Sequence, residues 1–393
     1  MWKQILAMTV MNLRSIPQRL AASTVIVLGV AGVVGVLVSV MAMATGLNRT
    51  LSDTGDPARA IVLRKSANTE GFSNVDVGWV GPIADAPGVV RDASGKAAVS
   101  PERIVGANLH KRADGGEAGI TLRGTSQTAF LVHPEWRIVD GRMFQPGLRE
   151  IVVGVAAASE FSGLDIGQDV QFGDSVWKVV GHFTSRGDSH ESDALADVST
   201  LMSAFGWGAY SSVTVRLESA AAFQRFKDTL TANPSLEVDV IREQEYYRQQ
   251  SQGIAALLYL VANVVGAIMA VGAIFTALNT MYSAVAARTH EIATLRAIGF
   301  GSAGVVVSVL TEALLLSLLG AVIGAAIAWL LFNGNSVSTN GGAIDSQVTF
   351  KLLVQPSLVA IGIAWACAVG LVGGLLPALR AARLPVASAL RPA

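Results

Sequence analysis

Four long apolar runs, almost free of charge, constrain this chain more than any other feature of its sequence. Leu20–Asn48, Gly253–Ala287 and Leu352–Leu379 contain no Asp, Glu, Lys or Arg, and Gly301–Asn333 contains only Glu312. A helix needs about 20 predominantly apolar residues to cross the hydrocarbon core of a bilayer. With 51% hydrophobic and 15% charged residues among its 393, the chain is also too apolar for an ordinary soluble domain. The sequence therefore predicts four transmembrane helices.

The charges outside these runs are distributed unevenly. Residues 45–252 carry 20 Lys and Arg against 26 Asp and Glu. The N-terminal tail, the segment around Glu291 and the C-terminal tail hold one acid, Glu291, and are otherwise basic through Lys3, Arg14, Arg19, Arg288, Arg296, Arg380, Arg383 and Arg391. Short basic segments stay on the cytoplasmic side of a membrane. We therefore expect both termini and the loop around Glu291 to be cytoplasmic, and residues 45–252 to be external.

The expected fold is an α-helical membrane protein with four transmembrane helices and a large α+β extracytoplasmic domain inserted between the first and second helices. The expected segments are a cytoplasmic amphipathic helix (1–19), transmembrane helix 1 (20–46), the external core domain (47–250), transmembrane helix 2 (251–283), a cytoplasmic helix (284–300), transmembrane helix 3 (301–333), a short polar external loop (334–356), transmembrane helix 4 (357–379) and a cytoplasmic tail (380–393). A cleaved signal peptide is the alternative at the N-terminus, but the first apolar run is longer than the roughly 7–15 residues of a signal sequence.

The external segment reads as a mixture of strands and helices. Runs bounded by Gly, Asp and Ser turns predict strands at Ala60–Arg64, Glu150–Val155, Asp169–Phe172, Val176–Phe183 and Ser212–Leu217. The apolar periodicity of Ala220–Leu230 predicts a helix. We expect two lobes, one from the ends of the segment and one from an insertion near 121–190. The polar stretch Glu243–Gln252 enters the second apolar run without a break, which predicts a continuous stalk helix; an ordinary helix end beside the membrane is the alternative.

A few residues within the runs are candidates for packing or function. Gly29, Gly32 and Gly35 recur every third residue and predict a small-residue face for close helix contact. Glu312 is an intramembrane polar residue and thus a functional candidate, although a structural role is the favoured interpretation, either capping backbone groups or pairing with a basic residue such as Arg296. Cys367 is the single cysteine, which excludes an intrachain disulfide.

Patterns of catalytic chemistry are absent from the sequence. The nearest match to a phosphate-binding loop, Ser94–Ala97, lacks the first glycine and the Ser or Thr after the lysine. Asp188, His190, Glu191 and Asp193 are close enough in sequence to bind a metal, but no spacing imposes a ligand geometry, so a solvated polar loop is favoured. We expect no catalytic, cofactor-binding or metal-binding residues, and no nucleic-acid partner.

The charged segment Arg288–Phe300 separates the second and third apolar runs. On a helix Arg288 faces Glu291, and Ile292 faces Leu295, giving an apolar ridge with charged flanks that ends at Gly299. Such a helix could insert Leu295 into the groove of a partner, with ion pairs setting the register. The residue types alone are equally compatible with a plain cytoplasmic connector.

The same segment, ARTHEIATLRAIGF, resembles the signature R-x-x-E-I-A-x-L-R-A-I-G of ABC transporter permeases of the FtsX/MacB type. Three further stretches resemble the same family. They are EALLLSLLGAVIG (Glu312–Gly324), LPALRAARLPVASAL (Leu376–Leu390) and, in the external segment, DIGQDVQFGDSVWKVVGHF (Asp165–Phe183). The resemblance thus extends over the whole chain.

The resemblance implies a mechanism and a set of partners. Two permease protomers, as a homo- or heterodimer, would pair in a bacterial inner membrane, with the large domain in the periplasm. Two cytoplasmic ABC ATPase subunits, expected to be separate polypeptides that bind ATP and Mg, would each grip a coupling helix. The implied ATPase-coupling residues are Arg288, His290, Glu291, Ile292, Leu295, Arg296 and Gly299. ATP hydrolysis would move the periplasmic domain by mechanotransmission, and this chain itself would need no cofactor.

Three functions are compatible with the family. The first is efflux or release of a substrate from the periplasm or outer membrane leaflet, with a periplasmic adaptor or lipoprotein as a further partner. The second is an FtsX-like regulator that activates a periplasmic cell-wall hydrolase without transport, and the third is a sensory partner of a histidine kinase. The large external segment favours the first, because hydrolase regulators of the family generally have smaller external domains and kinase-partnered members usually have more spans.

Overall fold

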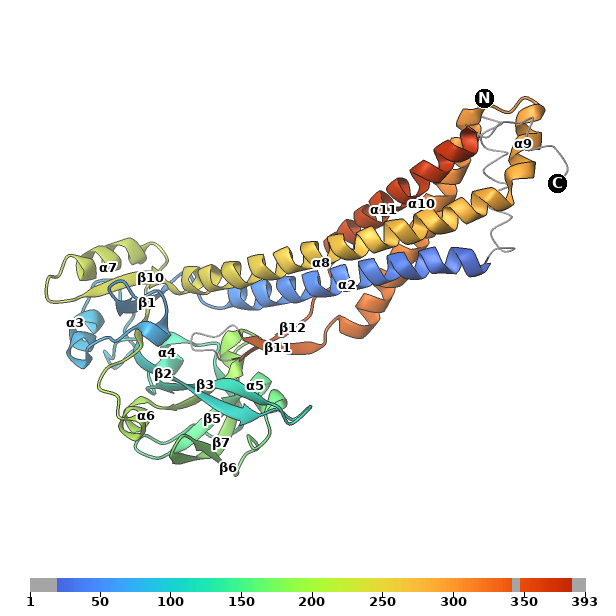
Figure 1. Cartoon of the computed structure of the whole chain (residues 1–393). Helices are drawn as coiled ribbons and strands as arrows, with labels where there is room; N and C mark the ends of the chain where they lie inside the picture. The colour runs from blue at the N-terminus through green and yellow to red at the C-terminus, as the bar shows by residue number, and fades with distance from the viewer. Residues whose placement is uncertain (1–19, 341–346, 384–393) are drawn as a thin grey trace. The chain divides into compact units, whose positions relative to one another are not determined.

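The computed structural model describes residues 20–340 and 347–383, and Figure 1 shows its elements. Its contacts divide the chain into two compact units. The helical unit comprises Met1–Thr45, Ala256–Asn335 and Leu352–Ala393, and the α/β unit comprises Gly46–Ala255 and Ser336–Lys351. The expected amphipathic helix at 1–19 and residues 384–393 of the expected tail lie outside the described residues.

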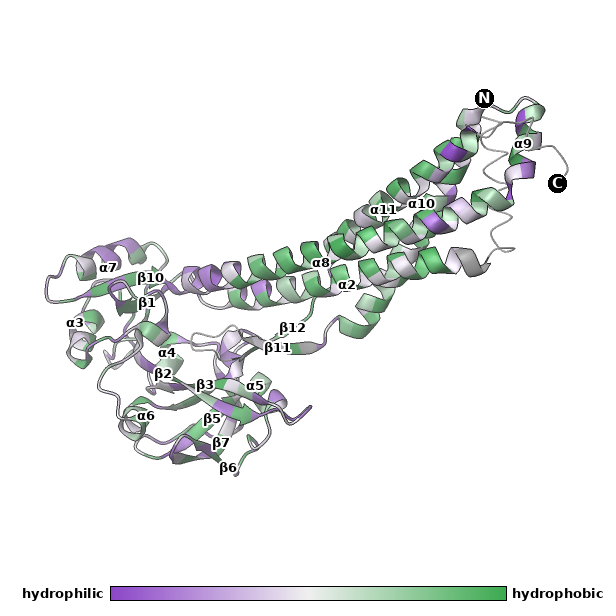
Figure 2. Ribbon diagram, viewed as in Figure 1, coloured by the Kyte–Doolittle hydropathy of each residue, from purple (hydrophilic) through white to green (hydrophobic). Residues whose placement is uncertain are grey.

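Four helices of the described chain are long and apolar enough to cross a membrane, as the sequence predicts. They are α2 (Leu20–Asp53), α8 (Glu243–Ala287), α10 (Ser302–Phe332) and α11 (Pro356–Ala382), with the short α9 (Thr289–Ala297) between α8 and α10. Figure 2 shows hydrophobic residues along most of these long helices and hydrophilic residues at the start of α8. The polar stretch and the apolar run of α8 form one helix of 45 residues, which confirms the predicted stalk.

Close packing of α2 against α10 depends on glycines of α10. A Cβ atom at Gly324 would lie 2.3 Å from the carbonyl oxygen of Ala31, and one at Gly320 would lie 2.7 Å from that of Val27. Positions Gly29 and Gly32 have no such neighbour within 4 Å. The small-residue face expected on α2 is therefore wrong for these two glycines, because the close approach is made by the partner helix.

Replacing Gly324 with alanine is expected to destabilise the helical unit by about 1–3 kcal/mol, since the added methyl group has to push two helix backbones apart. The measurement is the apparent melting temperature of the purified full chain in detergent. Gly29→Ala is the matched control, because its Cβ would enter open space. Equal melting temperatures for the two variants would contradict this account of the α2–α10 contact.

Ten strands of the described α/β unit form one sheet in the order β10-β1-β9-β2-β3-β8-β5-β7-β4, with β6 paired to β7. Their bounds are β1 Arg59–Arg64, β2 Val99–His110, β3 Glu117–Thr125, β4 Arg137–Gly141, β5 Glu150–Gly154, β6 Asp169–Phe172, β7 Ser175–Thr184, β8 Asp193–Asp197, β9 Ser212–Arg216 and β10 Val238–Arg242. The α-helices are α3 Val80–Ala84, α4 Ala129–Val132, α5 Val155–Glu160, α6 Val198–Phe205 and α7 Ala222–Thr231, with 3-10 turns at Glu70–Phe72, Val77–Trp79 and Ser189–Ser192. The five predicted strands and the predicted helix are confirmed, β6 with the predicted bounds and the others with small shifts at the ends.

Different parts of the sheet pack on separate hydrophobic cores, which is consistent with the two expected lobes. One core gathers apolar side chains from residues 60–99 and 213–240, including Phe223 and Phe226 of α7. Two others gather side chains from residues 109–205, centred on Trp177 and on Trp136. The middle part is therefore wider than the expected 121–190, because the hairpin of β2 and β3 belongs to it.

The loop expected at 334–356 contains a β-hairpin that belongs to the α/β unit. It is formed by β11 (Ser336–Asn340) and β12 (Gln347–Lys351). The backbone N–H of Thr349 donates to Ser192 Oγ at 2.9 Å, and Ser338 Oγ donates to Glu160 Oε1 at 2.6 Å. The α/β unit is thus built from two parts of the chain, and not only from the segment between α2 and α8.

Candidate functional site

The predicted coupling segment forms a short helix with sharp ends. α8 stops at Ala287, Arg288 leaves the helical conformation (φ −105°, ψ 12°), and α9 then runs from Thr289 to Ala297. Gly299 adopts a φ of +99°, a conformation that residues with a Cβ rarely adopt. The turn at Gly299 lets α10 begin at Ser302. The expected helix ending at Gly299 therefore exists, with Thr289–Ala297 as its regular part.

Leu295, the residue expected to enter the groove of a partner, lies on the inner face of α9. Ile292 is buried, and Leu295 is half-buried and packs against the core of the helical unit. The exposed residues of α9 and of the turn that follows it are His290, Glu291, Thr294, Ala297, Ile298 and Gly299. The apolar ridge of Ile292 and Leu295 thus holds α9 on its own bundle, and Ile298, 71% exposed, is the apolar side chain that α9 offers outward.

Glu312 pairs with the residue that joins α8 to α9. Arg288 Nη2 donates to Glu312 Oε1 at 2.6 Å, and both side chains are about 5% exposed. The expected ion pair with a basic residue is confirmed, but the base is Arg288 and not Arg296, because Arg288 reaches α10 from the end of α8. A cavity of about 20 Å³, enough for one water molecule, adjoins the pair. It is lined by Met281, Ala284, Val285, Arg288, Glu291, Ile292, Leu295, Val305, Ser308, Val309 and Glu312.

The α/β unit contains a second concentration of buried charge, around Arg123 of β3. Arg123 Nε donates to Asp193 Oδ2 at 2.8 Å, and Nη1 donates to Glu102 Oε2 at 2.8 Å and to Glu70 Oε1 at 3.1 Å. All four side chains are at most 10% exposed. Burial by itself lowers the pKa of Arg123, but the charges of Glu70 and Asp193 outweigh it and raise the pKa. The three carboxylates thus share one permanent cation.

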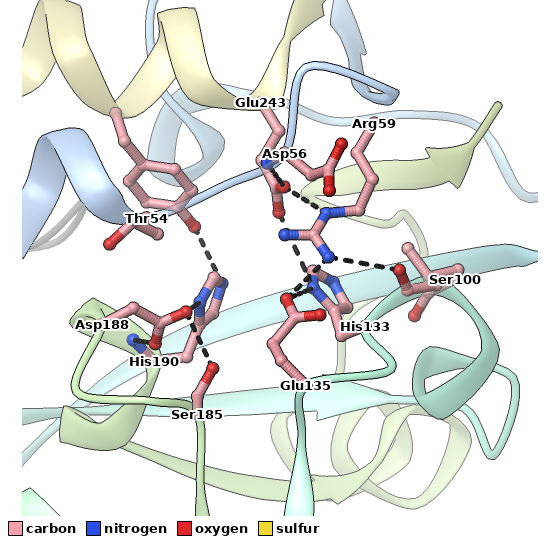
Figure 3. Close-up of polar contacts among 12 residues, drawn as sticks. Thr54, Asp56, Arg59, Ser100, His133, Glu135, Ser185, Asp188, His190 and Glu243 are labelled. Atoms are coloured by element: carbon pink, nitrogen blue, oxygen red, sulfur yellow. Dashed lines mark hydrogen bonds and ion pairs between the residues drawn. The ribbon is translucent and has the colours of Figure 1, made fainter. Parts of the chain in front are cut away.

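A neighbouring set of polar side chains, shown in Figure 3, surrounds the start of α8. We call Arg59, His133, Glu135 and Glu243 the junction cluster. Arg59 Nη1 donates to Glu135 Oε1 at 2.6 Å, and Arg59 Nε donates to Glu243 Oε2. His133 stacks on Trp136 with ring centroids 4.2 Å apart, and its Nδ1 lies 3.6 Å from Glu135 and 3.8 Å from Glu243.

The two histidines beside this cluster have opposite protonation behaviour. Burial, with help from Arg59 and His190, holds the pKa of His133 well below its ordinary value. Burial also acts to lower the pKa of His190, but the charge and hydrogen bond of Asp188 outweigh it and raise this pKa to about 9. As an imidazolium, His190 donates to Asp188 Oδ2 at 3.4 Å and to the Tyr247 hydroxyl oxygen at 3.1 Å.

The expectation of a solvated loop at Asp188–Asp193 is wrong. Asp188, His190, Glu191 and Asp193 are all buried. Glu191 Oε1 accepts the backbone N–H of Ser185 at 2.7 Å, and Asp188 caps the turn by accepting the N–H of His190 at 3.0 Å. Within the described ranges, no three His, Cys, Asp or Glu side chains are grouped so that they could hold a metal ion. The polar residues of this loop therefore stabilise the fold of the α/β unit.

Two family models match the chain. The model described as MacB-like periplasmic core domain matches residues 23–233, and the model described as FtsX-like permease C-terminal matches residues 263–386. The chain belongs to the MacB/FtsX family of ABC transporter permeases. The resemblance stated from the sequence motifs is confirmed, and these MacB-like and FtsX-like permeases combine transmembrane helices with a mixed α/β domain.

Relatives in the family carry export or permease names. The macrolide export ATP-binding/permease protein MacB of Azoarcus sp. (strain BH72) is 26% identical over 96% of this chain and 58% of its own length. The uncharacterized ABC transporter permease YknZ of Bacillus subtilis (strain 168) is 25% identical over 49% of this chain and 47% of its own length. The solved periplasmic region of MacB from Actinobacillus actinomycetemcomitans matches 49% of this chain and 92% of its own length, at 13% identity and a TM-score of 0.37. This chain spans about half or less of the length of most curated relatives compared, and 58% of the Azoarcus protein.

Two groups of residues in this permease escaped prediction from the sequence. Ile298 lies inside the recognised motif, but the motif does not say which apolar residue faces outward. The junction cluster has a weak sequence signal, namely single charged residues such as Arg59 and Glu243 at the ends of an apolar strand and a helix. Charge at such a position is usually exposed, so only burial identifies it.

Proposed function

We propose that this chain is the permease subunit of an ABC transporter that uses mechanotransmission. A cytoplasmic ABC ATPase moves α9, and α8 carries the movement to the periplasmic core domain. This movement drives efflux or release of a substrate from the periplasm or outer membrane leaflet of a bacterium with an inner membrane. The chain contributes no catalytic residue, and ATP and Mg bind to the ATPase.

One observation carries this proposal: α8 is a single helix from Glu243, beside the buried charges of the α/β unit, to Ala287, one residue before Arg288. A continuous helix transmits tilt or rotation along its length, because each turn is held by backbone hydrogen bonds. The Arg288–Glu312 pair supports the same function, since it ties the α8 end of the coupling segment to α10.

The exposed residues of α9 suit a protein partner on the cytoplasmic side. His290 and Glu291 offer polar and charged groups, and Ile298 offers an apolar side chain near them. Buried apolar anchors dominate interface energies, whereas charges mainly give specificity. We therefore assign the ATPase contact to His290, Glu291, Thr294 and Ile298, with Arg288, Ile292, Leu295, Arg296 and Gly299 shaping the segment.

The proposal includes two ATPase subunits and a second permease protomer. α8 is the least buried of the four candidate spans, with 22% of its most apolar window buried against 56% for α2. Its exposed apolar residues can contact lipid or a second protomer, identical or homologous. The export names of the relatives MacB and PvdT support transport, for which we propose a periplasmic adaptor or lipoprotein as a further partner.

Ile298→Glu is expected to weaken binding of the ATPase by at least about tenfold, because it places a charge where an apolar anchor should be buried. The measurement is co-purification of the ATPase with the full chain and the ATP turnover that the chain stimulates. Leu295 is unsuitable for this test, since it packs on the helical unit itself.

Val139→Glu on β4 is the matched control, because Val139 is a similarly exposed apolar residue, at 56%, in the α/β unit. Normal ATPase binding by Ile298→Glu would place the contact elsewhere.

Affinity purification of the full chain from its native host also tests the alternative function. Capture of a cell-wall hydrolase in place of a transport partner would favour the regulator.

A further inference from the structure

The ends of α2 and α8 lie side by side in the α/β unit. Ser251 Oγ of α8 donates to Asn48 Oδ1 of α2 at 2.9 Å. After α2, Gly55 adopts a φ of +92°, and a Cβ there would lie 2.8 Å from the backbone nitrogen of Gln244. The chain therefore leaves α2 pressed against the first turn of α8, and both helix ends share one polar environment.

Glu243, the first residue of α8, is the centre of this environment. Its carboxylate accepts the backbone N–H of Asp56 at 2.9 Å and the Nε–H of Arg59. Its side chain is 1% exposed, and that of Arg59 is 5% exposed. Arg59 lies on β1, which pairs with β10 on one side and β9 on the other. One carboxylate thus connects α8 to the connection after α2 and to the sheet.

The same arginine extends the connection to the middle part of the α/β unit. Arg59 Nη1 donates to Glu135 Oε1 at 2.6 Å and to the carbonyl oxygen of Val132 at 3.3 Å. Val132 is the last residue of α4, and Glu135 comes shortly after it, next in sequence to Trp136 of one core of the middle part. Figure 3 shows the contact of Arg59 with Glu135. The guanidinium group of Arg59 therefore connects Glu243 both to β1 and to the residues at the end of α4.

Buried ion pairs suit a positioning role better than a stabilising one. Desolvation offsets most of their attraction, so an apolar pair of similar volume stabilises a fold as well or better. What the ion pair adds is direction, because a carboxylate and a guanidinium accept few geometries. The next acid along α8, Glu245, lies on the outer side and pairs with Arg248 of the same helix at 2.6 Å. Of these two acids, Glu243 is the one whose carboxylate contacts elements other than α8.

We propose that Glu243 is a positioning residue that passes movement of α8 into the sheet of the α/β unit through Arg59. This inference rests on the proposed function, since it requires that an ATPase moves α8. It adds one point of entry for this movement, which passes from Glu243 to Arg59 of β1 and from Arg59 to Glu135. Glu243 binds no substrate and takes part in no reaction.

The test compares Glu243→Gln with Glu245→Gln in the full chain, reconstituted in nanodiscs with the ATPase that co-purifies with it. Backbone hydrogen exchange is followed in residues 243–251 and in β1, with ATP and without it. Without ATP, Glu243→Gln is expected to speed exchange at the start of α8 by at least about tenfold, and Glu245→Gln to leave it near the wild-type rate. With ATP, the exchange of β1 is expected to change in the wild type and in Glu245→Gln, but not in Glu243→Gln.

A second variant keeps the inference testable if Glu243→Gln does not fold. Arg59→Met combined with Glu243→Leu replaces the pair by apolar side chains, so the domain should fold while the ATP response of β1 is lost. A response of β1 in this double variant, or in Glu243→Gln, equal to that of the wild type overturns the inference alone. A wild-type complex in which ATP leaves β1 unchanged, or a chain that captures no ATPase, overturns the proposed function and this inference together.

Discussion

Glu312→Ala is expected to destabilise the helical unit by about 3–5 kcal/mol and to abolish ATPase stimulation, because it leaves the Arg288 guanidinium buried without its carboxylate. Each side chain of the pair is about 5% exposed, and the donor and acceptor atoms are 2.6 Å apart, so the guanidinium that loses its carboxylate stays largely out of contact with bulk solvent. The measurements are the apparent melting temperature of the purified full chain and the ATP turnover of its complex. A loss of this size should be visible in both.

A double variant separates the effect on the stability of the helical unit from the effect on ATPase stimulation. Arg288→Leu combined with Glu312→Leu removes both charges, and most of the lost stability should return. ATPase stimulation should stay low, because the apolar pair no longer holds the α8–α9 connection in one orientation. Thr311→Ala is the control, since the Thr311 hydroxyl donates only within α10, to Val307. A Glu312→Ala chain as stable as Thr311→Ala would show that the ion pair has no structural role.

The stability of the α/β unit is expected to fall between pH 6.5 and pH 9 because of His190. Its pKa in the folded chain is about 9, against an ordinary value of 6.5. The folded state therefore binds this proton more tightly than the unfolded state does. The resulting stabilisation is fully present below pH 6.5 and is lost as the pH rises through about 9. It is on the order of 3 kcal/mol. The measurement is the apparent melting temperature of the full chain across this range.

His190→Gln is expected to lose this alkaline dependence and to melt lower at pH 6.5. His110→Gln is the control, because the side chain of His110 is 66% exposed on β2. His133 acts in the opposite direction: burial lowers its pKa, so its contribution is present above pH 6.5 and is lost as the pH falls below that value. An alkaline decrease of the same size in His190→Gln and the wild type would contradict the assignment to His190.

Sequence patterns predicted the elements whose signal is local. Hydropathy and charge identified the four candidate spans, because a span depends on a run of neighbouring residues. The absence of a breaker after Glu243 predicted one continuous α8. Runs bounded by turn residues located strands such as β6 and β7, and the helical periodicity of apolar residues located α7. The motif around Glu291 identified the family, and two family models confirm it.

Three strands that contain buried charges, β2, β3 and β8, were missed. β2 and β3 carry Glu102 and Arg123, and β8 begins with Asp193, all of them buried. Each charge interrupts the apolar pattern that predicts a strand. It is tolerated inside only because its partners come from other strands. The same reasoning made Asp188–Asp193 look like a solvated loop.

What the sequence determined by itself was therefore the class of each segment: which runs can cross a membrane, where several strands lie, and to which family the chain belongs. The tertiary structure decided the partners. Glu312 binds Arg288, 24 residues away, and Glu243 accepts the N–H of Asp56, 187 residues away. It also decided that Leu295 faces the bundle and Ile298 faces outward. The physical reason is that apolar burial follows from composition over a few turns, whereas an ion pair depends on which distant backbones the fold brings within 3 Å.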